Sequence, residues 1–206
     1  MSRGLFITFE GIDGCGKSTQ ARRLERRLEE EGIASLLLRE PGGTPISEDI
    51  RKVLLNPDNS SMAPENEALL LAASRSQLLK EVIIPRLEKG TIVLCDRYID
   101  STLAYQGFGR DLPQKWLRQI NRLAFELAIP DKTFLFDLPV DVALSRLGNR
   151  QRDRIEATGV DFLEKVRNGF LTLAEQESDR YIILDGQNQI EELEKEISSQ
   201  VLRIIS

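Results

Sequence analysis

The sequence predicts an α/β fold, a doubly wound sheet of five parallel strands flanked by helices. Five short apolar runs recur along the chain, and they are continuous rather than alternating, as is typical of parallel strands buried on both faces. Stretches with helical spacing separate these runs, which gives the strand–helix alternation of the class. The runs lie at residues 5–9, 35–38, 91–95, 132–136 and 181–184.

The helices are predicted from the spacing of apolar residues. After the first run, Ala21, Leu24 and Leu28 recur at helical spacing, and Gly32 stands where a helix end is capped. The amphipathic stretch at 190–204 is interpreted as core packing rather than a coiled coil, because it lasts barely two heptads. Further helices are expected at residues 65–79, with a break or restart at Pro85, at 116–127 and at 161–177.

Composition limits the classes of protein to consider. The chain has 206 residues, 41% of them hydrophobic, and a net charge of −5. We expect one domain over residues 1–206, no nucleic-acid partner because the balance is acidic, and no membrane span because no apolar run approaches about 18 residues. The first apolar run is too short for a signal peptide, and two cysteines cannot form a disulfide framework. These features predict a cytoplasmic protein.

The chain contains no histidine. This excludes catalytic triads and general bases that depend on histidine, as well as most zinc sites. Any chemistry must therefore use Asp, Glu, Lys or Arg, or a metal held by oxygen atoms.

A glycine-rich segment follows the first apolar run and matches the pattern G-x-x-x-x-G-K-[ST] in full. Its glycines let backbone N–H groups turn inward around an anion, and the following helix adds its positive N-terminal end. Lys17 is predicted to reach the β- and γ-phosphates of ATP, and the Ser18 hydroxyl to bind Mg²⁺. The alternative is a tight turn with a surface lysine. The predicted ATP-binding residues here are Gly11, Ile12, Asp13, Gly14, Cys15, Gly16, Lys17, Ser18 and Thr19, of which Cys15 is also interpretable as a small buried filler.

Two absent motifs narrow the choice of activity. The chain lacks N-K-x-D, which a GTPase uses to recognise guanine, and L-S-G-G-Q, which ABC-type ATPases carry. A kinase acting on a small molecule remains.

Asp96 and Arg97 follow the third apolar run. An acid at the end of a strand beside the glycine loop is predicted to hold Mg²⁺ through water, and the neighbouring arginine to clamp a phosphate. A strand-end salt bridge is the alternative interpretation.

The whole chain resembles the thymidylate kinase family, whose members phosphorylate dTMP to dTDP with MgATP and form homodimers. DRYIDSTLAYQG (residues 96–107) and REPGGTP (residues 39–45) carry the resemblance most specifically, and the glycine loop is generic. Further matches are the pair EDIRKVLL and LLLAASRSQLL, and RDRIE at residues 152–156.

The resemblance implies roles in dTMP binding. Arg51 and Arg97 would bind the 5′-phosphate, and Asp13 would accept a hydrogen bond from the 3′-hydroxyl. Arg75 would donate to thymine O4, and Tyr105 would lie under the sugar, where it leaves no room for a 2′-hydroxyl. The remaining residues implied for this site are Glu40 and Pro41, which shape it, Ser101, and Thr102 and Gln106, which read the polar edge of the base.

One position departs from the family pattern. Members often carry Phe or Tyr four residues before the base-reading arginine, where the ring stacks on thymine, and this chain has Leu71 there. The missing stacking contribution is about 0.5–1.5 kcal/mol. Either base affinity is lower, or another aromatic residue such as Phe108 assists, or Leu71 is simply a core residue.

The catalytic arginine is expected in a lid at residues 148–159. Some members carry it directly after the acid of the glycine loop, where this chain has Gly14. The resemblance instead favours a lid that closes over ATP, with Arg150 and Arg152 on the phosphates beside Lys17, Asp96 and Arg97 as the catalytic set. Arg146 is expected to pack on adenine, and Arg154 to pair locally with Asp153 or Glu156. The alternative is a solvated basic helix end.

Two rival functions remain open at this point. One is a kinase of another pyrimidine monophosphate or of a deoxynucleoside, against which Tyr105, Arg75 and the two phosphate clamps argue. The other is a nucleotide-binding module without turnover. The leucine-rich stretch at 68–79 is a candidate homodimer interface, with ordinary core packing as the alternative.

Overall fold

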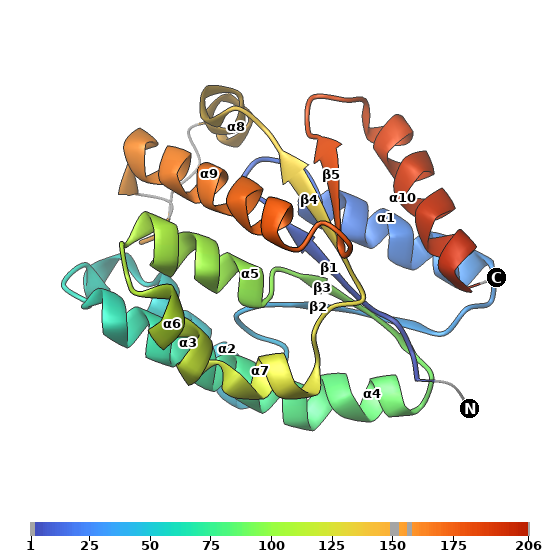
Figure 1. The fold of residues 1–206 in the computed structure, drawn as a ribbon, viewed down its shortest axis with the longest axis horizontal. Coiled ribbons are helices and arrows are strands. Elements are labelled where there is room, and N and C mark those ends of the chain that lie inside the picture. The colour runs from blue at the N-terminus through green and yellow to red at the C-terminus, as the bar shows by residue number, and fades with distance from the viewer. Residues whose placement is uncertain (1–2, 149–152, 156–157, 206) are drawn as a thin grey trace.

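The computed structural model describes residues 3–148, 153–155 and 158–205, and in these ranges it contains the predicted parallel sheet (Figure 1). The strand order is β2-β3-β1-β4-β5, and every neighbouring pair is parallel. Each strand lies within one residue of its predicted run. The strands are β1 (Phe6–Glu10), β2 (Ser35–Arg39), β3 (Ile92–Asp96), β4 (Lys132–Asp137) and β5 (Tyr181–Asp185).

The strand order reverses direction at β1, which lies between β3 and β4. In open parallel sheets, ligands bind outside the carboxyl ends of the strands at such a switch point. The glycine loop leaves the carboxyl end of β1, and Asp96 ends β3, where it pairs in register with Phe9. The two motifs far apart in sequence are therefore neighbours at this edge.

Helices cover both faces of the sheet. α1 and α10 pack against each other on one side, while α9 packs on the segment after α5 and α4 packs on β3 (Figure 1). The α-helices are α1 (Lys17–Glu30), α2 (Pro45–Leu55), α3 (Pro64–Leu78), α4 (Ile84–Glu88), α5 (Ile99–Thr102), α6 (Gln114–Ile120), α7 (Arg122–Leu127), α8 (Val140–Leu147), α9 (Val160–Gln176) and α10 (Ile190–Ile205). The 3₁₀ turn η1 (Pro57–Asn59) and the π-helical segments η2 (Leu79–Ile83) and η3 (Leu103–Gly109) complete the elements.

The helix predicted at residues 116–127 is wrong as a single element. α6 ends at Ile120 and α7 begins at Arg122, with Asn121 between them. Asn121 is buried and its side chain accepts a hydrogen bond from Arg75, a residue 46 positions earlier. A long-range polar contact therefore accompanies a break that local periodicity did not reveal.

Pro85 lies where the second predicted helix changes register. α3 ends at Leu78, η2 follows as a π-helical segment, and α4 restarts at Ile84. Proline has no N–H to donate to the preceding turn. The wider π-helical turn of η2 accommodates it, so that the chain stays helical from α3 through α4.

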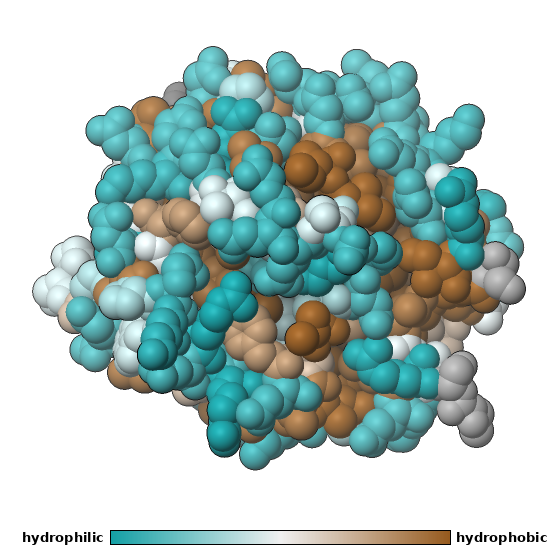
Figure 2. Space-filling view, in the orientation of Figure 1, coloured by the Kyte–Doolittle hydropathy of each residue, from teal (hydrophilic) through white to brown (hydrophobic). Residues whose placement is uncertain are grey.

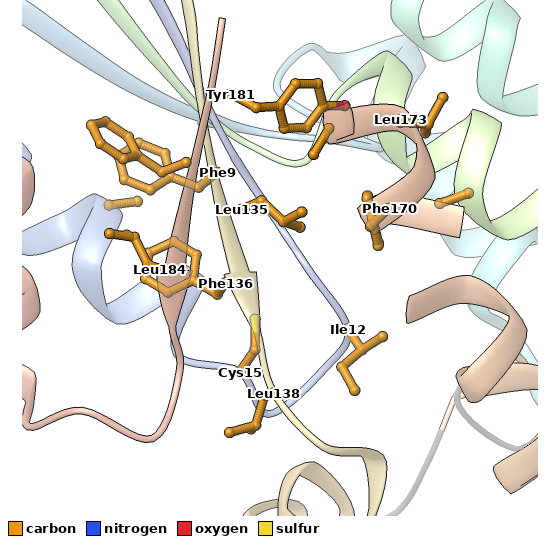
Figure 3. Packing of buried hydrophobic residues seen from close by; sticks show 14 of the residues in the cluster. Phe9, Ile12, Cys15, Leu135, Phe136, Leu138, Phe170, Leu173, Tyr181 and Leu184 are labelled. Atoms are coloured by element: carbon orange, nitrogen blue, oxygen red, sulfur yellow. The ribbon is translucent and has the colours of Figure 1, made fainter. Parts of the chain in front are cut away.

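The core lies on both faces of the sheet. Successive residues of β1 join different clusters: Phe6 packs with buried residues of η2 and α4, such as Ile83 and Leu87, and Ile7 belongs to a larger cluster that includes residues of both α1 and α9. Figure 3 shows Phe9, Phe136 and Leu184 on one side of β4 and β5, and Leu135, Leu173 and Tyr181 on the other.

Polar side chains cover most of the face drawn in Figure 2, with apolar residues exposed in separate patches. None of the helices in the described ranges has the length and apolar character needed to cross a membrane.

Candidate active site

The glycine loop joins β1 to the partly buried first turn of α1. Gly16 precedes the helix with φ 99°, a conformation that favours glycine. Gly14 has φ 87°, and a Cβ built there would lie 2.5 Å from the carbonyl oxygen of Ala143 in α8. There is consequently no room at position 14 for the arginine that some family members carry after the acid.

Lys17 and Asp13 lie together inside this loop. Lys17 is only 5% exposed, and its Nζ is 3.3 Å from Asp13 Oδ1. The same carboxylate oxygen accepts a hydrogen bond of 2.8 Å from Arg97 Nη2. Burial alone would raise the pKa of Asp13, but the charges of Arg97 and Lys17 outweigh it and hold the pKa well below its usual range. Asp13 is therefore an ionised acceptor that links the loop to Arg97.

Ser18 and Asp96 present oxygen atoms side by side. The Ser18 hydroxyl donates to Asp96 Oδ2, which joins the start of α1 to the end of β3. A hydroxyl and a carboxylate are the hard ligands that Mg²⁺ prefers, so this pair fits the metal. The described residues contain no cluster of three or more His, Cys, Asp or Glu suited to a metal, so water and phosphate oxygens would supply the other ligands.

A pocket of about 300 Å³ opens beside the loop. All eleven residues that the sequence predicted for the substrate line it: Asp13, Glu40, Pro41, Arg51, Leu71, Arg75, Arg97, Ser101, Thr102, Tyr105 and Gln106. Sequence reasoning missed four further lining residues, namely Leu55, Tyr98, Asp153 and Ile155.

Arg97 is held in an uncommon backbone conformation, with φ 68°. A non-glycine residue in this region is strained, and such strain persists only where surrounding contacts fix it. Here the guanidinium donates to Asp13, to Ser101 Oγ at 3.0 Å and to the Tyr105 hydroxyl at 3.0 Å. It also lies over the Tyr105 ring, 4.9 Å from its centre. The arginine predicted as a phosphate clamp is thus fixed in place.

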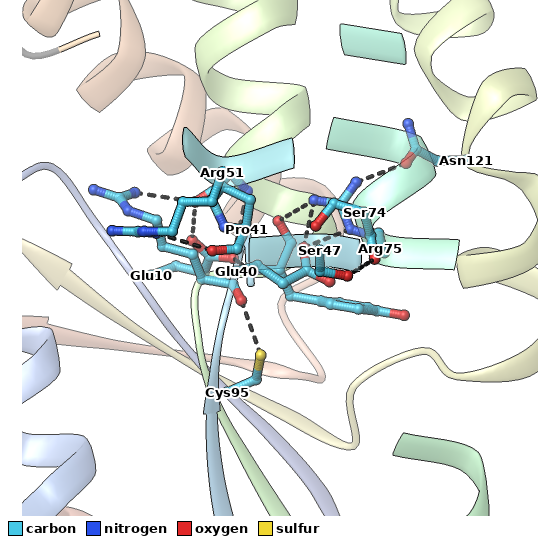
Figure 4. A network of polar contacts seen from close by, with 12 residues as sticks. Glu10, Glu40, Pro41, Ser47, Arg51, Ser74, Arg75, Cys95 and Asn121 are labelled. Atoms are coloured by element: carbon cyan, nitrogen blue, oxygen red, sulfur yellow. Dashed lines mark hydrogen bonds and ion pairs between the residues drawn. The ribbon is translucent and has the colours of Figure 1, made fainter. Parts of the chain in front are cut away.

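Arg75 forms a buried ion pair with Glu40 on the other side of the pocket (Figure 4). Its Nη2 lies 2.6 Å from Glu40 Oε2, and both side chains are 3% exposed. Burial raises the pKa of Glu40 to about 7 despite the charge of Arg75. Arg75 also donates to Asn121 Oδ1 at 2.6 Å and to the Tyr98 carbonyl at 3.2 Å. Its Nε donates to Glu40 Oε2 at 2.8 Å as well, so four of its five N–H groups face these partners and one N–H of Nη1 is left for a ligand.

Arg51 reaches the pocket from α2. Its Nη1 donates to the Pro41 carbonyl at 2.9 Å, and burial followed by the nearby charge of Arg39 lowers the pKa of Arg51. An arginine with this environment gains from an anionic ligand, because added negative charge offsets both effects.

The wall facing α3 comes from α5 and η3. Tyr105 is buried, and its hydroxyl lies between Arg97 and Asp13. Thr102 Oγ1 and Gln106 Oε1 are buried and have no hydrogen-bond partner among the described residues. Leu71 lines the pocket at 8% exposure, whereas Phe108, the suggested substitute aromatic, packs against Gly169 of α9.

Two buried acids near the pocket were missed by sequence reasoning. Glu10 accepts from Tyr98 N at 2.7 Å and from Ser101 Oγ at 2.6 Å, and burial raises its pKa to about 8. Glu67 is 1% exposed and contacts Gln106. Helical spacing gave a signal for Glu67, because residues 67, 71 and 75 share one face of α3.

The arginines predicted in and beside the lid are placed differently by the structure. Arg146 Nη1 donates to the Gly186 carbonyl at 2.8 Å, which joins α8 to the loop after β5. Arg150 and Arg152 lie outside the described residues. Arg154 has long-range partners in addition to the local pairing that the sequence predicted: its Nη2 lies 2.6 Å from Glu67 Oε2 and its Nε donates to the Leu54 carbonyl at 2.8 Å. Glu156, one of the two predicted local partners, lies outside the described residues, so the local pairing stays a prediction. Arg154 therefore links segment 153–155 to Glu67 of α3 and to the end of α2.

Cys15 is 1% exposed and belongs to the hydrophobic core (Figure 3). Burial raises the pKa of its thiol. Its side chain is a core filler, which leaves only its backbone to serve the glycine loop.

Known proteins resemble this chain over most of its length. A family model described as thymidylate kinase matches residues 9–197. A thymidylate kinase of Geobacter sulfurreducens is 48% identical over 195 residues, covering 91% of this chain and 92% of that protein. A thymidylate kinase of Desulforudis audaxviator is 51% identical over 187 residues, covering 90% and 85%. The chain belongs to the thymidylate kinase family.

Proposed function

We propose that this protein transfers the γ-phosphoryl group of ATP to the 5′-phosphate of dTMP, which yields ADP and dTDP. One observation carries the proposal: Asp13 contacts both Lys17 of the glycine loop and Arg97 of the pocket. A phosphate donor on the loop and a phosphate acceptor in the pocket would therefore meet at this carboxylate. Family membership supports dTMP as the acceptor.

The donor half consists of residues 11–19. Their backbone N–H groups would surround the ATP phosphates, with Lys17 on the β- and γ-oxygens. Ser18 and Asp96 would hold Mg²⁺, which when bound neutralises charge on the transferred group. Arg146, at the junction of α8 and the loop after β5, would pack on adenine.

The acceptor half positions dTMP through charged and polar side chains. Arg97 and Arg51 would bind the 5′-phosphate, and Asp13 would accept from the 3′-hydroxyl. The buried Tyr105 ring would exclude a 2′-hydroxyl from the sugar site. The base would meet Arg75 at O4, Thr102 and Gln106 at its polar edge and Leu71 at its face, with Glu40, Pro41 and Ser101 shaping the site.

Catalysis in this site requires no general base. The attacking oxygen belongs to an ionised phosphate, and it displaces ADP from the γ-phosphorus, with no proton to remove. Arg150 and Arg152 of a lid at 148–159 would stabilise the charge on the transferred group, together with Lys17 and Arg97.

We also propose that the protein acts as a homodimer through α3. Leu69 is 47% exposed, and a groove of about 260 Å³ runs between α3 and α6–α7, lined mainly by apolar residues. A second copy would bury this groove. We expect sedimentation to give twice the chain mass, and Leu69→Glu to shift it toward the monomer.

A cytoplasmic location is proposed from the cysteines. Cys15 and Cys95 are both free and buried, as suits a reducing compartment.

The test is ADP release with MgATP across dTMP, dUMP, UMP, dCMP, dGMP and thymidine. We expect strong preference for dTMP, with UMP excluded at the sugar and thymidine lacking the phosphate. Turnover of UMP or thymidine would mean that the acceptor site is wrongly assigned while the ATP half stands. ATP binding without turnover of any acceptor would favour a nucleotide-binding module.

A further inference from the structure

Glu67 is a buried carboxylate in the wall behind the base pocket. It lies on α3 two turns before Arg75, and its side chain is 1% exposed. Its partners come from two distant parts of the chain. Gln106 Nε2 donates to Glu67 Oε1 at 2.7 Å, while Arg154 Nη2 and Arg110 Nη2 lie 2.6 Å and 3.4 Å from Oε2.

Arg110 and Arg154 determine whether Glu67 accepts or donates hydrogen bonds. The guanidinium groups of Arg110 and Arg154 both face Glu67 Oε2, which makes Glu67 the acidic partner of a buried ion-pair cluster. An ionised carboxylate has acceptor oxygens only and no proton to donate. Arg110 and Arg154 therefore keep Glu67 as a pure acceptor.

A pure acceptor fixes the orientation of the Gln106 amide. Only the NH₂ group of Gln106 can face Glu67, because its carbonyl oxygen would repel the carboxylate. The other end of the amide, Oε1, is buried and has no hydrogen-bond partner among the described residues. Since Gln106 lines the pocket, its unused group toward a ligand is an acceptor.

We propose that Glu67 is a positioning residue that makes the pocket select pyrimidines carrying a proton at N3. This inference rests on the proposed dTMP site. An N3–H donates to a fixed acceptor, whereas the bare N3 of cytosine places two acceptors against each other. Arg154 supports this selection through Glu67 and not through a contact with the base. Its neighbours Asp153 and Ile155 line the pocket, so this segment is linked to recognition of the base.

The decisive variant is Glu67→Gln, with Glu65→Gln as its matched control on the exposed face of the same helix. A glutamine at 67 both donates and accepts, so the Gln106 amide is free to reverse and to offer its NH₂ group to cytosine. We would measure dissociation constants for dTMP, dUMP and dCMP by calorimetry, kcat/KM for each, and the melting temperature.

We expect Glu67→Gln to reduce the preference for dTMP over dCMP about tenfold, the value of one hydrogen bond. The preference for dTMP over dUMP should not change, because both bases carry N3–H. In a Gln106→Leu background, Glu67→Gln should have no further effect on the dCMP ratio, since Glu67 acts through Gln106. Glu65→Gln should match the wild type.

A purely structural role for Glu67 would weaken all three ligands equally, and a dCMP ratio within twofold of wild type would overturn the proposal. If Glu67→Gln does not fold, Arg154→Met and Arg154→Lys decide: the lysine should keep the ratio, and the methionine should lower it several-fold. An unchanged ratio in Arg154→Met would also overturn it. Failure of the wild type to bind or phosphorylate dTMP would instead refute the proposed function.

Discussion

The two halves of the candidate site present different chemical groups, backbone N–H groups in one and side chains in the other. The glycine loop is one unbroken segment, residues 11–19, that offers mainly backbone N–H groups at the start of α1. The acceptor pocket consists of side chains from the loop, α2, α3, α5, η3, the ends of β2 and β3, and residues 153 and 155. Two of its arginines are already paired with acids of the pocket, Arg75 with Glu40 and Arg97 with Asp13.

This difference separates phosphate binding from substrate selection. Backbone N–H groups recognise any phosphate chain and depend on local conformation. Side chains held in buried ion pairs carry shape and charge specific to one substrate, but each depends on its partner, because an unpaired buried charge is costly. We therefore expect donor-side changes to affect rate, and pocket changes to affect affinity and stability together.

The largest effect is expected for Lys17→Met, which tests the donor half alone. Loss of the ammonium that reaches the transferred phosphoryl group should lower kcat by about 10³-fold or more. The melting temperature should change little. ADP release and calorimetric dTMP binding measure the two halves separately, with Lys115→Met, an exposed lysine on α6, as control. A kcat within tenfold of wild type would contradict the assignment of Lys17.

Arg75→Met tests the dependence of one pocket residue on its partner. The change leaves Glu40 buried without its counter-charge, which should cost about 3 kcal/mol of stability. It should also weaken dTMP binding at least tenfold. The double variant Glu40→Gln, Arg75→Met should regain stability and still bind dTMP poorly, as measured by urea unfolding and calorimetry. If the single and double variants are equally stable, the pair does not behave as a unit.

Glu10→Gln tests whether a buried acid beside the pocket makes the stability of the protein depend on pH. The pKa of Glu10 is about 8 in the folded protein, above its ordinary value of 4.5. Between these values the folded state keeps a proton that the unfolded state has lost, so stability falls as pH rises through this window. We expect urea midpoints at pH 5 to 8 to fall less steeply in Glu10→Gln, while Glu65→Gln retains the wild-type slope. Equal slopes in all three proteins would exclude Glu10 as the source.

The smallest effect is expected for Leu71→Phe. A ring at this pocket position can stack on the base, which is worth about 0.5–1.5 kcal/mol. The dissociation constant of dTMP should fall roughly threefold, with kcat unchanged. Calorimetry measures this, and Leu127→Phe, at an exposed position, serves as control. Weaker binding would mean that the leucine site is already filled and that the ring overpacks it.

The sequence by itself determined the strands and the glycine loop, and its resemblance to a family named eleven of the residues that line the pocket. The apolar runs mark strands because burial on both faces demands continuous apolar side chains, and β1 to β5 lie within one residue of them. The glycine loop is equally local. Gly14 and Gly16 adopt positive φ angles, which glycine reaches without steric cost whatever the rest of the fold does.

Only the tertiary structure decided which side chains meet. The break at Asn121 is accompanied by a contact with Arg75, and Arg154 pairs with Glu67, which lies 87 positions earlier in the chain. Such choices depend on burial, because a charge removed from water must find a partner wherever the fold brings one. Local periodicity carries no information about which residues far apart in sequence come together. The partners of Glu10, Glu67 and Arg154 therefore became evident only in the folded chain.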